Sequence, residues 1–303
     1  MMINEEALKE KIIKYKKYKE ASKILEKRYE KYNYRINKKR EELKLERKEF
    51  EGLYTPYTLT RSYKLQILKF EMKENINNIL EKISLACKNS NRDKKEIFLL
   101  PVSKTVDVDK IQEAIDLGFD TFGENKVQEI LKKYEYFDGK VKFHMIGHLQ
   151  TNKVKSIIDK VELIHSLDRI SLLDKLELEA KNKGITVNCL VEVNIGKEDS
   201  KSGIFEEDVL DFIREVSKRD NVLVNGLMTV APYCEDTEDT RIYFKKMKSL
   251  FDEISKLKLK NVDMKILSMG MSNDFMVAIE EGSNLIRIGT SIFGARNYGV
   301  LSN

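Results

Sequence analysis

The chain has few cysteines, and none of them form a CxxC pair. Cys87, Cys189 and Cys234 are odd in number and widely separated in the sequence. This argues against a disulfide framework and against a cysteine-rich zinc site, and it is typical of proteins in a reducing compartment. We therefore expect a cytoplasmic protein.

Long apolar runs are missing as well. The apolar run over residues 97–102 is far too short to cross a bilayer, and the N-terminus is polar from its fourth residue. We expect neither a signal peptide nor a membrane-spanning helix, and no membrane partner.

Two motifs that would indicate other chemistry are absent. No GxGxxG follows the first strand-like run, which argues against an open dinucleotide-binding sheet. In "HMIGH" the two histidines are four residues apart, but the glutamate of HExxH is lacking. We expect no metal site there, and we interpret His144 as structural.

The net charge of +5 is concentrated in the front of the chain. Residues 1–50 contain 17 Lys+Arg and 10 Asp+Glu, a charge of +7, and residues 51–303 carry −2. Neither glycine nor proline interrupts this segment before Gly52, and apolar residues recur every three or four positions from Tyr18 to Ile36, which predicts a long exposed helix.

Several roles are open for this helical extension and linker, residues 1–65. A solvated helix that rests on its own domain or pairs with another copy is favoured, because interleaved glutamates dilute the positive field. The alternative is an arm for nucleic acid or a membrane surface. A third possibility is that Met72 is the more usual start and that the segment is dispensable. We expect no nucleic-acid partner.

Strand-like and helix-like runs alternate through the second part of the chain, residues 66–303. The eight expected strands are residues 96–103, 119–122, 141–147, 161–166, 187–194, 222–228, 262–268 and 285–289. Amphipathic stretches such as "DKIQEAIDLG" and "FEEDVLDFIREVSKR" separate them. Eight strand–helix units predict a (β/α)₈ barrel.

In such barrels the chemistry lies where the strands end, and polar residues collect there in this sequence. Lys104 follows the first strand, and a lysine at the rim of a pocket can attack a carbonyl, although a lysine that reaches past a strand end to water is the commoner case. The other residues expected around the mouth are Asn125, His148, Ser166, Asn194, Met228, Thr229, Ser268, Ser272, Arg287, Gly289 and Thr290.

The loops after the seventh and eighth strands predict an anion site. In "SMGMSND" and "RIGTSIFGAR", Gly270, Ser272, Gly289 and Thr290 place small residues and hydroxyls at helix starts, where free N–H groups can bind phosphate. A lysine facing a phosphate site across one pocket is what pyridoxal 5′-phosphate (PLP) requires.

These residues also carry a resemblance. "PVSKT", "FGENKVQE", "HMIGHLQTNK", "VNIGKEDSKSG", "GLMTVAP", "SMGMSND" and "RIGTSIFGAR" resemble, in order and spacing, the YggS/PROSC family of pyridoxal-phosphate homeostasis proteins. The match runs from about residue 80 to 299 and leaves residues 1–65 uncovered. The resemblance implies the barrel of the alanine-racemase N-terminal type.

The resemblance also implies roles for individual residues. Lys104 is expected to hold PLP as a Schiff base. Ser272, Gly289 and Thr290 are expected to bind its phosphate, with backbone from Met271. Asn125 is expected beside the ring or its hydroxyl, and Met228 against the ring, with Ser166 and Ser268 completing the cofactor-binding set. Arg287 is expected to point at the pyridine nitrogen, which would leave that nitrogen unprotonated and the cofactor a poor electron sink.

The resemblance implies a carrier rather than an enzyme. Full racemases add a β-rich domain with an opposing base, and the chain ends at Asn303, about where the barrel should end. We expect a PLP-binding protein of vitamin B6 and amino-acid homeostasis, without catalytic residues and without metal. Its expected partners are PLP and apo-enzymes that use it, and it is expected as a monomer or weak homodimer. The alternative is a weak PLP-dependent amino-acid racemase.

Three further features are interpreted more plainly. Lys201, in "EDSKSG", could contact an acidic partner or take the cofactor in passing, but a surface loop lysine is favoured. Asn152 and Lys153 mark a helix start, with a supporting role at the mouth as an equal alternative. We do not expect Cys87 and Cys234 to be reactive thiols.

Overall fold

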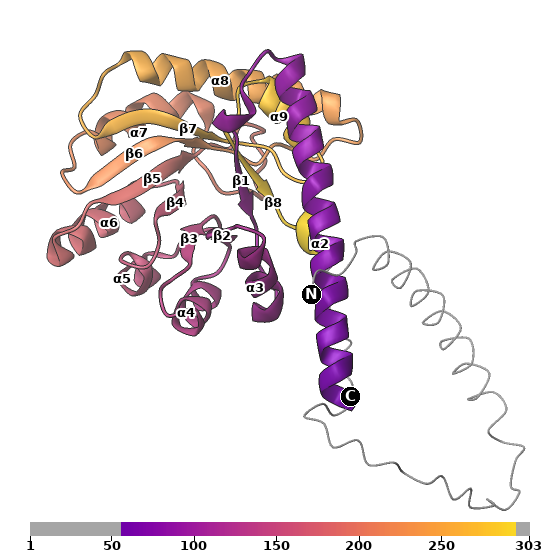
Figure 1. The fold of residues 1–303 in the computed structure, drawn as a ribbon. Coiled ribbons are helices and arrows are strands. Elements are labelled where there is room, and N and C mark those ends of the chain that lie inside the picture. Colours follow the sequence, from indigo (N-terminus) through magenta and orange to yellow (C-terminus); the bar gives the residue numbers. More distant parts are fainter. Residues whose placement is uncertain (1–55, 295–303) are drawn as a thin grey trace, which may run out of the picture. The chain divides into compact units, whose positions relative to one another are not determined.

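The computed structural model describes residues 56–294, with side chains from Lys69 onward except that of Phe70. Its strands are β1 (Phe98–Pro101), β2 (Thr121–Glu124), β3 (Lys142–Met145), β4 (Leu163–Leu167), β5 (Val187–Glu192), β6 (Val222–Met228), β7 (Val262–Ser268) and β8 (Leu285–Ile288). All eight expected strands are present, and Figure 1 shows them at the centre of the domain with helices outside.

The strands form one parallel sheet that nearly closes on itself. Their order is β1-β8-β7-β6-β5-β4-β3-β2, and each adjacent pair in that order is parallel. The gap between β1 and β2 is bridged just beyond β1, where Val102 pairs with Gly123 and the Ser103 N–H donates to the Gly123 carbonyl at 3.0 Å. The predicted (β/α)₈ barrel is therefore confirmed.

Helices connect successive strands, as parallel neighbours require. The connecting helices are α3 (Val108–Asp116), α4 (Val127–Tyr136), α5 (Val154–Ile157), α6 (Ile170–Lys183), α7 (Val209–Val216), α8 (Arg241–Lys256) and α9 (Phe275–Glu280), while α2 (Pro56–Asn89) precedes β1 and α10 (Thr290–Phe293) follows β8. Short 3₁₀ turns lie at Lys94–Glu96, Thr151–Lys153, Glu206–Asp208 and Thr237–Thr240.

The main core lies between the sheet and the helices. Alternate strand residues such as Phe122 and Phe143 are fully buried there, packed with helix residues such as Leu172 and Phe244. The barrel interior holds a smaller apolar cluster of Leu163, Leu190 and Met228. Since the interior is also lined by histidine, serine and arginine, this barrel has a partly polar centre.

Six of the eight strands differ from the prediction by one or two residues at an end, and the shifted starts of two of them have a clear cause. The second strand begins at Thr121 rather than at residue 119, because the Phe119 N–H still caps α3 by donating to the Ala114 carbonyl at 3.1 Å. The first strand begins at Phe98, because Glu96 belongs to a 3₁₀ turn capped by Asp93. Both errors come from hydrogen bonds at a preceding turn.

The chain divides into two units, Met1–Ile67 and Leu68–Asn303. The expected helix over residues 1–50 lies outside the described residues, and the expected domain boundary after residue 65 stays a prediction. Within the second unit, α2 buries Ile76, Ile79 and Ile83, which recur at the three- and four-residue spacing of one helix face. Over residues 56–294, no helix is long and apolar enough to span a membrane.

Candidate functional site

A cavity of about 740 Å³ opens at the carboxyl ends of the strands. Seven of the ten predicted cofactor-binding residues line it: Lys104, Asn125, Met271, Ser272, Arg287, Gly289 and Thr290. These residues lie in or follow β1, β2, β7 and β8, so the pairing of β1 with β8 brings residues from the first and last strands to one site. The predicted mouth therefore corresponds to a real cavity.

Lys104 lies in a tight turn directly after β1. The turn is closed by the Val106 N–H, which donates to the Ser103 carbonyl at 3.0 Å. Thr105 has a φ of +61°, a left-handed conformation that β-branched residues rarely adopt. Lys104 itself is half-buried at the cavity wall, while Ser103 is fully buried.

Asn125 is positioned by a close approach between two loops. A Cβ added to Gly147 would lie 2.5 Å from the Asn125 carbonyl oxygen, so only glycine allows the loop after β3 to pass so near. The Asn125 Oδ1 atom is buried and has no hydrogen-bond partner among the described residues. Since an unpaired buried acceptor is costly, this atom is available to a ligand in the cavity.

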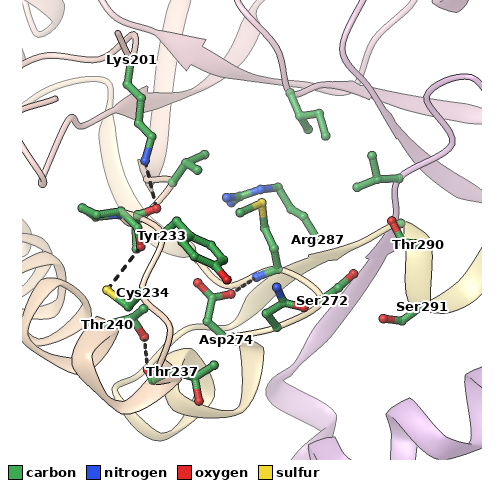
Figure 2. Close-up of a pocket in the computed structure, with 18 of the residues that line it drawn as sticks. Lys201, Tyr233, Cys234, Thr237, Thr240, Ser272, Asp274, Arg287, Thr290 and Ser291 are labelled. Carbon is green, nitrogen blue, oxygen red and sulfur yellow. Dashed lines mark hydrogen bonds between the residues drawn. The ribbon is translucent and has the colours of Figure 1, made fainter. Parts of the chain in front are cut away.

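The loops after β7 and β8 form the opposite wall. Gly270 has a φ of +92°, and a Cβ there would lie 2.6 Å from the Cβ of Ala278, so this turn requires glycine. The turn brings Ser272 to the cavity, and Thr290 and Ser291 face it from the start of α10 (Figure 2). Hydroxyls from two loops therefore converge on one region.

Both backbone polar groups of Met271 have hydrogen-bond partners within the protein. Its N–H donates to Asp274 Oδ1 at 2.6 Å, and its carbonyl accepts from the Phe275 N–H at 3.0 Å. Burial raises the pKa of Asp274, against the effect of the hydrogen bond from Met271. The anion-binding role predicted for the Met271 backbone would require Asp274 to release that N–H.

Arg287 projects into the cavity from β8, between the Tyr233 loop and Thr290 (Figure 2). Its Nη1 donates to Ser268 Oγ at 2.5 Å and its Nη2 to the Thr229 carbonyl at 2.8 Å. Burial lowers the pKa of Arg287 to about 10, which leaves it a cation at neutral pH. A buried cation held by two neutral groups keeps a positive field in the cavity.

A chain of polar side chains extends from Arg287 into the barrel. Ser268 Oγ lies 3.3 Å from His165 Nδ1, and His165 Nε2 lies 3.1 Å from His144 Nδ1. Burial, with a smaller contribution from Lys142, lowers the pKa of His144 to about 4. Burial, then His144 and Arg287, holds the pKa of His165 well below its usual range. Both rings are therefore neutral at pH 7.

The remaining three predicted residues are buried in the strands and do not line the cavity. Ser166 lies in β4, and its Oγ has no hydrogen-bond partner within residues 69–294. Met228 ends β6 and packs in the interior apolar cluster. Ser268 ends β7 and supports Arg287. Their direct contact with a cofactor stays a prediction.

Lys201 is not the surface loop lysine that the sequence favoured. It lines the cavity, and its Nζ donates to the Ala231 carbonyl at 3.1 Å and pairs with Glu198. Its side chain is 28% exposed, so it is a wall residue and not a free surface lysine. The β5–α7 loop folds back because Asn194 bonds to the Glu198 and Lys201 carbonyls.

Sequence reasoning missed other residues of the wall, among them Tyr233, Cys234, Asp274 and Ser291. Two lie in "VAPYCED", directly after β6, and their position after a strand end was an available signal. His148 is near the mouth without lining the cavity: its Nδ1 lies 3.4 Å from Asp168 Oδ2. Cys87, Cys189 and Cys234 are all free thiols.

Metal chemistry has no geometric support in the described part of the chain. Within residues 69–294, no group of three or more histidine, cysteine or carboxylate side chains is arranged so that it could bind a metal ion. His144 is stacked on Phe98 with ring centroids 6.2 Å apart, in addition to its bond with His165. This is the environment of a packed core histidine.

Comparisons with known proteins agree with this geometry. The family model for the alanine racemase N-terminal domain matches residues 76–297. A pyridoxal phosphate homeostasis protein of Aquifex aeolicus is 46% identical over 226 residues, covering 74% of this chain and 98% of the relative. An unknown protein from Bifidobacterium adolescentis has a similar crystal structure, with a TM-score of 0.72 and 32% identity, covering 75% of this chain and 96% of the other.

A further solved structure carries a ligand. PipY of Synechococcus elongatus PCC7942, with PLP bound, aligns with a TM-score of 0.62 and 29% identity, covering 71% of this chain and all of PipY. Together, the family model, the identity to the Aquifex relative and the nearly complete coverage of that relative show that this chain belongs to the YggS/PROSC family of pyridoxal phosphate homeostasis proteins, which has the barrel of the alanine racemase N-terminal domain.

Proposed function

We propose that the chain binds PLP in the cavity at the strand ends and serves vitamin B6 and amino-acid homeostasis as a carrier. The observation that supports this most directly is that Lys104, Arg287 and the hydroxyl groups of Ser272 and Thr290 line one cavity of about 740 Å³. The Aquifex relative is named a pyridoxal phosphate homeostasis protein, and the structure of PipY has PLP bound.

The residues of the cavity fit this cofactor in three respects. The unpaired Asn125 Oδ1 offers an acceptor to the ring hydroxyl. The Ser272, Thr290 and Ser291 hydroxyls offer donors to a phosphate, together with N–H groups at the start of α10, which lack intrahelical acceptors. Lys104 offers the amine that an aldehyde requires.

When bound, PLP supplies an aldehyde that reacts reversibly with amines. Lys104 would hold it as a Schiff base. Arg287 would donate a hydrogen bond to the pyridine nitrogen, because a guanidinium that is a cation at neutral pH has no acceptor to offer. That nitrogen would then stay unprotonated, which disfavours carbanion chemistry. This set of residues suits storage and release better than turnover.

A titration with two ligands tests the proposal. Purified protein is titrated with PLP and with pyridoxamine phosphate, which has the same ring and phosphate but no aldehyde. We expect wild type to bind both, and Lys104→Ala to lose PLP affinity by about a hundredfold, which corresponds to about 2.8 kcal/mol, while pyridoxamine phosphate binds as before. Equal PLP affinity in both proteins would remove Lys104 from the site.

Release to a recipient is the second part of the proposal. Holo-protein mixed with an apo-enzyme that requires PLP should restore its activity, and Lys104 should limit the rate through the hydrolysis of its bond to the cofactor. We propose a monomer or weak homodimer that works in the cytoplasm, with residues 66–303 as the binding domain and residues 1–65 as an extension. Apo-enzyme activity that recovers no faster than with the same amount of free PLP would contradict direct delivery.

A weak amino-acid racemase is the alternative function. One observation favours it: Tyr233 lines the cavity and is 82% exposed, so a second proton donor and acceptor is available in the same cavity as Lys104. Incubation of the holo-protein with L-alanine in heavy water separates the two functions. The carrier predicts slow Cα deuteration without D-isomer. Sustained D-alanine formation that Tyr233→Phe abolishes would make the protein an enzyme.

A further inference from the structure

A buried cluster of charges lies beneath the turn that carries Lys104. Lys133, on α4, places its Nζ 2.6 Å from Glu124 Oε1 and 3.4 Å from Glu129 Oε2. The exposed fractions of the side chains are 6% for Lys133, 0% for Glu124 and 23% for Glu129. None of these residues lines the cavity, and the binding of PLP proposed above does not use them.

The cluster holds the residue before Lys104 at two atoms. The Ser103 carbonyl accepts from Lys133 Nζ at 2.8 Å, and the Ser103 hydroxyl donates to Glu124 Oε1 at 2.5 Å. Ser103 and Glu124 are fully buried, so these bonds form where water does not compete. Burial raises the pKa of Glu124 to about 7, and Lys133 and Ser103 act against that increase.

The cluster also holds the residue after Lys104. The Thr105 N–H donates to Glu129 Oε2 at 2.8 Å, and the same oxygen is the one that faces Lys133. Burial alone would raise the pKa of Glu129, but the Thr105 N–H and Lys133 outweigh it and lower the pKa below its usual value. Glu129 therefore receives the Thr105 N–H as a carboxylate.

Thr105 needs such a restraint. Its φ of +61° is a conformation that a β-branched residue adopts at a cost, so a free turn would relax toward negative φ. Relaxation would rotate the backbone next to Lys104 and move its side chain. An amine that must meet an aldehyde in a fixed ring loses effectiveness when it is displaced by about 1 Å.

We infer that Lys133, with Glu124 and Glu129, is a positioning residue that fixes the turn on both sides of Lys104 and so sets the reactivity of the Lys104 amine toward the cofactor aldehyde. The inference rests on the proposed function. A single ammonium links two carboxylates, one from β2 and one from α4, to the backbone at residues 103 and 105. The turn thus keeps its strained shape without any contact from the cofactor.

The test compares Lys133→Met with a matched control, Lys175→Met. Lys175 also pairs with a glutamate one helical turn away, Glu179 at 2.6 Å, but on α6 and away from the cavity. The readouts are the rate of covalent attachment of PLP to Lys104, trapped with borohydride, and the affinity for pyridoxamine phosphate. We expect Lys133→Met to slow attachment by about tenfold or more, with pyridoxamine phosphate affinity changed less than about twofold, and Lys175→Met to change neither.

The outcomes separate the inference from the proposed function. Wild type that forms no adduct would contradict PLP binding through Lys104 itself. Wild-type rates in a folded Lys133→Met protein would overturn the positioning role alone. A parallel loss for both ligands would also overturn it, because a general loss of structure would explain the result.

Removal of one member of a buried ion pair strongly destabilises proteins, so a gentler variant is included. Glu129→Gln keeps the Glu124–Lys133 pair and weakens the acceptor for the Thr105 N–H. We expect it to fold and to slow attachment by about threefold, with pyridoxamine phosphate bound as in wild type. An unchanged rate of attachment in Glu129→Gln would overturn the role of the cluster even if Lys133→Met failed to fold.

Discussion

The regions behind the two walls of the cavity bury polar groups in different ways. The lysine side, Ser103, Lys104, Glu124, Glu129 and Lys133, contains charges that pair with one another. The anion side, Gly270, Ser272, Arg287, Gly289 and Thr290, contains one buried cation whose hydrogen bonds go to neutral groups, Ser268 Oγ and the Thr229 carbonyl.

This difference suggests a division of labour. Paired charges fix a backbone turn, and their fields partly cancel inside the protein. The hydrogen bonds of Arg287 go to neutral groups, and the Asp274 and Glu192 carboxyls act on it without a direct hydrogen bond, so part of its field is left for a ligand; the glycines and hydroxyls near it leave room for an anion. The lysine side would position a reacting group, and the anion side would supply binding.

The largest expected effect comes from removing both hydroxyls of the anion side. Charge-assisted hydrogen bonds contribute roughly 1.5–3 kcal/mol each, so Ser272→Ala and Thr290→Ala should each weaken PLP by about tenfold and together by about a hundredfold. Pyridoxal, which lacks the phosphate, should bind the double variant as it binds wild type. Equal losses for PLP and pyridoxal would mean that the hydroxyls act on the barrel and not on the phosphate.

The chain of polar side chains that extends from Arg287 to His144 also predicts a pH effect. The pKa of His144 is about 4 in the folded chain and ordinarily 6.5, so the unfolded state takes up this proton first as the pH falls. The contribution of His144 to stability should therefore be complete above pH 6.5 and decrease by about 3 kcal/mol by pH 4. Urea unfolding of wild type and His144→Gln at both pH values measures this change as a difference. A difference that does not depend on pH would contradict a neutral buried histidine.

The smallest expected effect concerns the backbone of the anion side. Gly270→Ala places a Cβ 2.6 Å from that of Ala278 at a φ of +92°, and we expect a loss of stability of about 1–3 kcal/mol with weaker PLP binding. Gly118→Ala is the matched control, since its φ is +103° and nothing lies within 4 Å of the added Cβ. Thermal unfolding and PLP titration of both variants check this. Equal PLP affinity in the two variants would contradict a specific role for the turn at Gly270.

The sequence predicted the barrel and much of the anion side because their signals are local. Strands and helices alternate visibly, and "SMGMSND" combines a required glycine with a hydroxyl in one short turn. Ser166, Met228 and Ser268 were predicted at the mouth because they too lie near strand ends. Successive side chains in a strand, however, point to opposite faces of the sheet. Which side chains line a cavity depends on register, which the sequence does not show.

The lysine side was harder to predict because its contacts are distant in sequence. Lys133 bonds to the carbonyl of Ser103, which lies 30 residues earlier in the sequence. Its neighbour in sequence, Lys132, is exposed. One signal was available: Lys133 follows the buried Val127 and Ile130 at three-residue steps and so lies on the buried face of α4. A charged residue on an apolar stripe indicates a buried partner, and only the fold identified it as Glu124.

The most direct test of the account is the site of covalent attachment. Among the described residues, two lysines line the cavity: Lys104, beside the barrel closure, and Lys201, on the loop after β5, where it pairs with Glu198 and donates to the Ala231 carbonyl. The holo-protein is reduced with borohydride, digested, and its phosphopyridoxyl peptide is sequenced by mass spectrometry. The account predicts the adduct on Lys104, and an adduct found mainly on Lys201 or another lysine would contradict it.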